Sequence, residues 1–168
     1  MHSSAVNESG HSRAPGNQMA LDAEQRLYEL STETVDRLLD IWRAVEEADG
    51  NFGEMFYRLL FQSSPQAAGL FPGDMNVQQQ RLTETLGEAV RLAGEPRQLI
   101  LLLRATGVRH LHYQVTQGHF SLMESALIDA LREHLGTRFD GADEDLFRAF
   151  FNLMAVVMRH VMARAGSA

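Results

Sequence analysis

Apolar residues recur at helical spacing along almost the whole chain, and this pattern constrains the fold more than any other feature. From residue 21 onward they return every three or four positions, as on one face of an α-helix. The two-residue alternation of a half-buried strand is nearly absent, and the 168 residues include only four prolines. The sequence therefore predicts an all-α domain of seven or eight helices.

Capping residues and chain breaks set the expected helix boundaries. Ser31 or Thr32 is a candidate N-cap, Pro65 suits the first turn of a short helix, and Pro96 opens another. We expect a helix over 21–30, one from this cap to the Asp49-Gly50 break, and one around 52–60. Further helices are expected over 65–70, 77–93, 96–113, 119–135 and 143–163.

The N-terminal stretch differs from the rest. Residues 1–19 are rich in Ser, Gly, Asn and His and have no periodic apolar face, which predicts a disordered tail. No apolar stretch follows a basic start, so a signal peptide is not expected. The remaining residues, 20–165, are long enough for one domain with a sizeable core.

Composition excludes several classes of function. A formal charge of −7 without a basic stripe argues against nucleic acid or an anionic membrane surface as a partner. The absence of cysteine excludes disulfides and thiolate or iron–sulfur chemistry, and is consistent with a cytoplasmic location. The longest apolar runs, Leu99–Leu103 and Leu153–Met158, are too short to span a bilayer, so no membrane association is expected.

His110 is the first candidate functional residue, because it interrupts an apolar helical segment. It is either a core histidine bonded to the backbone or an axial ligand of haem iron. A ligating imidazole needs an acceptor for its second N–H, and the carbonyl one turn back, near Thr106, is suitable. His112 lies about 200° further round the helix, so both cannot face one iron, and periodicity does not choose between them.

Two aromatic residues precede it. Tyr57 flanks the apolar stripe of its helix, one turn before Phe61. Its hydroxyl either reaches the surface or, in a dry pocket, donates a hydrogen bond to a bound gas. Phe71 follows the short helix at a corner, where it is either a core residue or a wedge against a porphyrin.

The long helix over 77–93 adds three candidates. Gln78 lies one turn before Leu82 and shares its face, so its amide is either a second donor or simply solvated. Arg81 would lie near the pocket mouth, where it pairs with a haem propionate or remains a solvated helix charge. No histidine occurs on this helix, which excludes a second histidine ligand from that side.

These segments together resemble single-domain bacterial globins. Met55–Phe71 is similar to the second helix and following corner of bacterial haemoglobins and of the globin domains of flavohaemoglobins. Gln78–Leu82 resembles the start of their distal helix, and Arg109–Met123 their proximal helix and the turn after it. Leu82 and His110 are 28 residues apart, the spacing that this family uses. The resemblance covers residues 32–162.

The resemblance implies a globin fold around a haem b pocket, with His110 as the proximal iron ligand. It makes Tyr57 the principal distal donor, Gln78 the second distal donor and Leu82 the apolar distal wall. The expected haem contacts are Phe71, Arg81, Leu82, Val115 and Phe120. The expected function is reversible binding of O2, CO and NO, with transport, storage or NO dioxygenase turnover as physiological roles. The alternative is a gas or redox sensor that acts through a partner protein.

One departure from the family bears on the chemistry. Flavohaemoglobins place a tyrosine ten residues after the proximal histidine, in a network that makes the imidazole more basic, whereas this chain has Phe120 there and no suitably placed glutamate in its last helix. Peroxidase-like O–O cleavage is therefore less favoured. The chain has no flavin or nicotinamide domain, so re-reduction would need a separate reductase. The broad apolar surface of the last helix is also compatible with a homodimer.

Overall fold

The computed structural model describes residues 15–111, 113 and 115–165. Over these residues it contains helices and no strand, which confirms the all-α prediction. The α-helices are α1 (Pro15–Tyr28), α2 (Thr32–Glu47), α3 (Phe52–Ser63), α4 (Met75–Arg91), α5 (Pro96–Leu111), α6 (Gln117–Leu135) and α7 (Gly141–Ala165). Short 3-10 segments are η1 (Pro65–Leu70), η2 (Leu92–Gly94) and η3 (Gly136–Arg138).

Helix α1 corrects the expected tail, because it begins at Pro15 and not after residue 19. Proline suits the first helical position, and the Gln18 side chain donates to Asp22 one turn later at 2.7 Å. The apolar pattern starts only at Ala20, the first residue that α1 buries. The buried later turns therefore stabilise the whole helix, including its first turn, which has no apolar face. Residues 1–14 of the expected tail lie outside the described residues.

Capping residues account for the other shifted boundaries. Ser31, one of the two expected caps, accepts a hydrogen bond from the Thr34 amide at 3.1 Å and begins α2. Asp74 accepts from the Asn76 amide at 2.8 Å, so α4 begins at Met75, two residues earlier than expected. At the other end of the site, α5 stops at Leu111 instead of near Tyr113.

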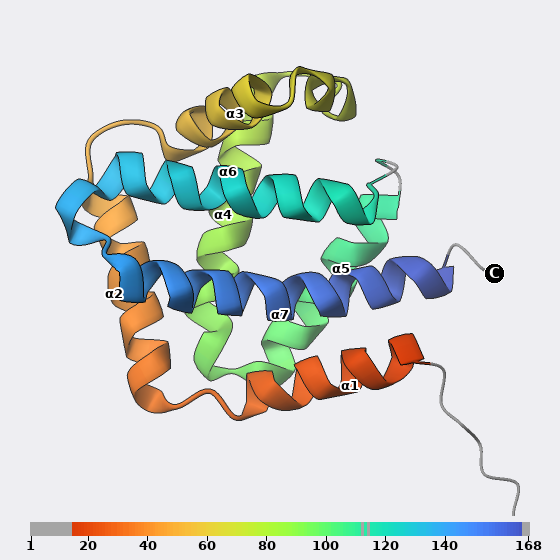
Figure 1. The fold of residues 1–168 in the computed structure, drawn as a ribbon. Helices are drawn as coiled ribbons and strands as arrows, with labels where there is room; N and C mark the ends of the chain where they lie inside the picture. The colour runs from red at the N-terminus through yellow and green to blue at the C-terminus, as the bar shows by residue number, and fades with distance from the viewer. Residues whose placement is uncertain (1–14, 112, 114, 166–168) are drawn as a thin grey trace, which may run out of the picture.

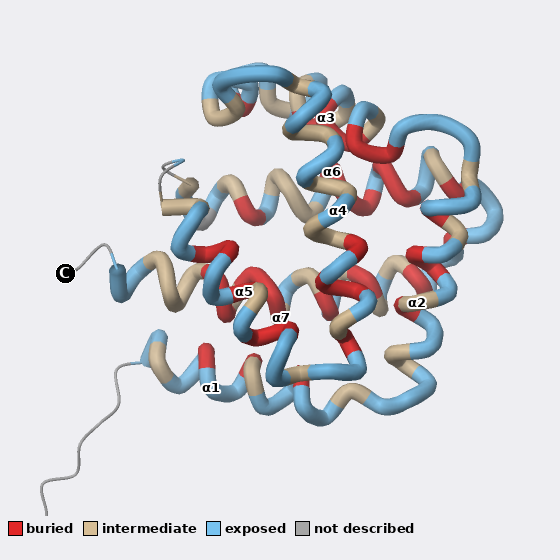
Figure 2. The backbone as a smooth tube through the Cα atoms, turned by 180° about the vertical axis from the view of Figure 1, so that it is seen from behind, coloured by how far each residue is buried: buried red, intermediate tan, exposed pale blue. Residues whose placement is uncertain are grey.

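The helices form crossed layers (Figure 1). Helix α7 lies between α1 and α6, and α3 lies on the far side of α6. Helices α2, α4 and α5 cross these four (Figure 1). Figure 2 shows the buried residues along the inner sides of the helices, where Phe56, Phe147 and Phe150 are the largest fully buried side chains.

Two glycines allow helices to approach at van der Waals distance. A Cβ on Gly53 of α3 would overlap the main-chain carbonyl of Gln79 in α4. A Cβ on Gly107 of α5 would come within 2.9 Å of the carbonyl oxygen of Met158 in α7. Both crossings involve helices that carry candidate site residues, so these glycines help to set the spacing of the site.

By length and composition alone, α7 is the described helix that could cross a membrane. It has 25 residues, and its most apolar window has a mean hydropathy of 1.3. The same helix packs between α1, α5 and α6 and contributes Phe147, Met154 and Val157 to the buried core. A core helix satisfies the same criterion, and its packing here explains its apolar composition.

Candidate functional site

The candidate iron ligand and the candidate gas-facing donors lie on two diverging helices and on a helix that packs against one of them. Helices α4 and α5 meet at η2 and diverge from it (Figure 1). Gln78 and Leu82 belong to the first half of α4, and His110 to the last turn of α5. Tyr57 is in α3, which packs against α4.

The His110 imidazole has one of its two nitrogens engaged. Its Nδ1 donates to the Thr106 carbonyl oxygen at 2.8 Å, so the expected acceptor one turn back is confirmed. With the proton on Nδ1, the other nitrogen, Nε2, keeps a free lone pair. Burial lowers the pKa of His110, the Thr106 carbonyl opposes this effect, and the Arg109 guanidinium lowers the pKa further. The site therefore favours a neutral imidazole with an available donor atom.

Two aromatic rings lie beside His110, and a cation lies beside one of them. The Phe120 ring lies 6.5 Å from it between centroids, with the planes 21° from parallel. The Tyr113 ring lies 6.2 Å away, at 87°. On Phe120, the guanidinium carbon of Arg159 lies 5.8 Å from the ring centroid. Sequence reasoning missed Arg159, because helical periodicity cannot show which α7 residue meets Phe120 of α6.

Tyr57 is buried in an aromatic cluster. Its ring lies 5.0 Å from that of Phe71 and 5.1 Å from that of Phe56, both near perpendicular, and 5.7 Å from Phe61. The residue is only 4% exposed, and its hydroxyl makes no hydrogen bond to any described residue. Burial raises the pKa of Tyr57 to about 12, and Tyr113 adds to this rise. The phenol is thus a protonated, unused donor.

The three consecutive glutamines of α4 differ in their partners. Gln79 accepts a hydrogen bond from Asn51 at 3.3 Å, and Gln80 donates to Glu84 at 2.7 Å. Gln78 is half-buried, and its side-chain amide makes no hydrogen bond within the described part of the chain. The structure therefore distinguishes Gln78 from Gln79 and Gln80 by its lack of a described side-chain partner, which the sequence alone could not do.

The remaining candidates divide into core and surface residues. Phe71, Leu82 and Val115 are half-buried and pack against the hydrophobic core. Arg81 is exposed and forms no ion pair with any described residue, which leaves its guanidinium available at the surface. His112, the alternative to His110, lies outside the described residues.

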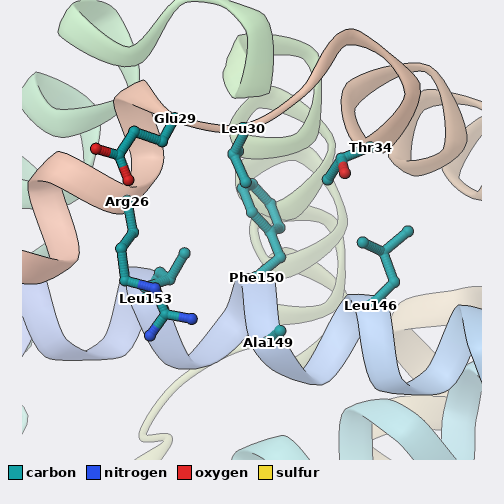
Figure 3. A pocket seen from close by; sticks show the side chains of 8 residues that line it. All are labelled: Arg26, Glu29, Leu30, Thr34, Leu146, Ala149, Phe150 and Leu153. Carbon is teal, nitrogen blue, oxygen red and sulfur yellow. The ribbon is translucent and has the colours of Figure 1, made fainter.

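A cavity of about 290 Å³ lies away from these residues, between the end of α1 and α7 (Figure 3). Figure 3 shows Leu30 and Phe150 at its centre, with Arg26 and Glu29 on the α1 side. Its lining contains none of the predicted site residues. The chemistry suggested by His110 and Tyr57 therefore belongs to a different part of the fold.

Comparison with known proteins decides the family. A family model described as Globin matches residues 54–158, which is more than half of the chain and includes Tyr57, Gln78 and His110. The chain belongs to the globin family. The predicted resemblance and fold class are thereby confirmed.

The globin also resembles a solved structure. An engineered carbene transferase made from a protein of Rhodothermus marinus, to which nitric oxide dioxygenase activity is attributed, aligns with a TM-score of 0.74 and 22% identity. The alignment covers 82% of this globin and 96% of that chain. At this identity the likeness establishes the fold. A search of curated proteins finds no significant match.

The globin family implies a haem cofactor, and the residues present fit one. His110 offers an imidazole whose tautomer is fixed by Thr106 and whose Nε2 has no hydrogen-bond partner among the described residues. Tyr57 is a buried residue whose hydroxyl bonds to no described side chain, and Phe71 beside it offers an aromatic face. These residues supply an imidazole to bind the iron, a hydroxyl to hydrogen-bond a small bound molecule, and apolar surface to contact the porphyrin. Haem with a bound gas requires these three kinds of group.

Proposed function

We propose that this globin holds haem b through His110 Nε2 and reversibly binds O2, CO and NO. The observation that carries the proposal is the pairing of a tautomer-fixed imidazole on α5 with an unpartnered, buried phenol on α3. Haem, when bound, supplies the iron at which diatomic gases bind. The Thr106 carbonyl orients the His110 ring, and this second contact fixes which nitrogen faces the metal.

We assign the gas-facing side to residues of α3 and α4. The hydroxyl of Tyr57 donates a hydrogen bond to a polar ligand, and its high pKa keeps it protonated at physiological pH. Gln78 supplies a second donor, because its amide is not used elsewhere among the described residues. Leu82 and Phe71 exclude water. Two donors in a dry pocket hold O2 strongly and release it slowly, which suits chemistry better than bulk transport.

Turnover of nitric oxide is the reaction that this arrangement favours. The balanced reaction combines NO, O2 and one electron to give nitrate. In this proposal a reductase supplies the electron. The activity attributed to the Rhodothermus marinus protein supports this proposal at the level of a shared fold. The sensor alternative predicts gas binding with little nitrate formation.

The test is a nitrate measurement. Haem-loaded protein is reduced, equilibrated with O2 and mixed with NO in equal amount, and nitrate is quantified. We expect nearly one nitrate per haem in the first turnover, and continued turnover when an artificial electron donor is present. Gas binding with no nitrate would contradict the dioxygenase role and favour the sensor.

A further inference from the structure

The Phe120 ring contacts both the proposed iron ligand and a cation. His110 and Phe120 are stacked with 6.5 Å between centroids, and the Arg159 guanidinium carbon lies 5.8 Å from the Phe120 centroid. These residues come from α5, α6 and α7, so the packing of three helices brings them together. A guanidinium at this distance from an aromatic face makes a cation–π contact.

Among the described residues, the charged groups that these contacts bring near His110 are guanidinium groups. Its Nδ1–H bonds to a neutral carbonyl, that of Thr106. Arg109 is the neighbouring residue in sequence, and its Nη2 donates to the Thr106 hydroxyl at 3.0 Å. Arg159 forms no ion pair with any residue that the structure describes. The field on this side of the site is therefore positive.

We propose that Arg159, acting through Phe120, is a positioning residue that raises the reduction potential of the haem held by His110. A nearby cation stabilises the ferrous state, which carries one positive charge fewer than the ferric state. Phe120 offers no acceptor to the imidazole, so nothing there increases the basicity of the ligand. The inference rests on the proposed haem binding by His110.

The size of the effect follows from Coulomb's law. Arg159 and the His110 ring are no farther apart than the sum of the two contacts through Phe120. With an effective dielectric constant of about 20–40, one charge at this longest distance changes the ferrous-to-ferric ratio about three- to tenfold. A tenfold change corresponds to about 59 mV for one electron. Because O2 binds the ferrous form, the stack permits a milder electron donor than the same globin would otherwise need.

The experiment compares reduction potentials of haem-loaded variants by spectroelectrochemistry. Arg159→Gln and Arg159→Met remove the charge, Arg159→Lys keeps it, and Arg164→Gln removes an equal charge farther along α7 as the matched control. We expect both neutral variants to lower the ferrous-to-ferric ratio three- to tenfold. Arg159→Lys should retain most of the wild-type value, and Arg164→Gln should change the ratio by less than half as much as Arg159→Gln.

Two results would overturn the inference in distinguishable ways. Equal potentials for the Arg159→Gln and Arg164→Gln variants, with normal haem spectra, would show that the Phe120 stack carries no special coupling. Failure of the wild-type protein to bind haem would overturn the proposed function and this inference together. Two neutral variants, Arg159→Gln and Arg159→Met, are measured, so that the inference can still be tested if one of them does not fold.

Discussion

At the scale of single residues, the Tyr57 hydroxyl has the most direct expected effect on a bound gas. We expect Tyr57→Phe to raise the O2 dissociation rate ten- to a hundredfold, because it removes a hydrogen bond worth about 1.5–3 kcal/mol to a polarised ligand. Stopped-flow displacement of O2 by CO measures this rate. Tyr28 is 51% exposed, so Tyr28→Phe is the matched control and should leave the rate unchanged. Equal rates in both variants would remove Tyr57 from the distal site.

The same phenol has a pH signature. Burial raises its pKa to about 12, against about 10 in an unfolded chain. Between these values the native state binds more protons than the unfolded state, so stability falls as pH rises through this window. An ultraviolet tyrosinate titration of the haem-free protein should show a late step that Tyr57→Phe removes. A titration curve that Tyr57→Phe leaves without any lost late step would contradict the raised pKa of this hydroxyl.

At the scale of helices, the crossing of α3 over α4 controls the distance between the two proposed donors. Gly53 has no room for a Cβ against the Gln79 carbonyl, so Gly53→Ala must displace one helix. We expect a loss of about 1–3 kcal/mol in the free energy of unfolding, measured with urea. Gly16 in α1 has nothing within 4 Å of the added carbon, and Gly16→Ala should be neutral or slightly stabilising. Equal stability of the two variants would show that the contact between α3 and α4 has room for a Cβ at position 53.

Helix α1 is expected to be an integral part of the domain. Leu27 is buried and packs with the core, so Leu27→Ala should cost about 2–5 kcal/mol of unfolding free energy. Leu21 on the same helix is 40% exposed, and Leu21→Ala should stay within about 0.5 kcal/mol of the wild type. Chemical unfolding of both variants measures the difference. A small effect at Leu27 would mean that α1 detaches before the core unfolds.

The helices themselves show what periodicity predicts and where it fails. Every expected helix is present, because burial of one face leaves a clear spacing in the sequence. The start of α1 was missed because its first residues, Pro15 to Met19, bury nothing. A helix start that is set by a cap, such as Asp74 before α4, rests on one side-chain hydrogen bond. Such a bond leaves little trace in the spacing of apolar residues.

At the scale of the whole molecule, the contacts of the candidate site residues differ in how far the sequence predicts them. The Thr106 acceptor follows from helix geometry alone, because it lies one turn before His110. The bond that distinguishes Gln79 from Gln78 comes from Asn51, the N-cap residue of α3. Arg159 meets Phe120 only through the packing of α6 and α7. Contacts within one helix were predictable, and contacts between helices were not.

The central claim is that His110 is the iron ligand of a haem globin, and one absorption experiment tests it most directly. Wild-type protein, His110→Ala and His112→Ala are mixed with haem, reduced, and exposed to CO. We predict a Soret band with a CO-dependent shift in the wild type and in His112→Ala, and the loss of both in His110→Ala. A wild type without a Soret band, or a His110→Ala variant that keeps the wild-type spectrum, would contradict this assignment.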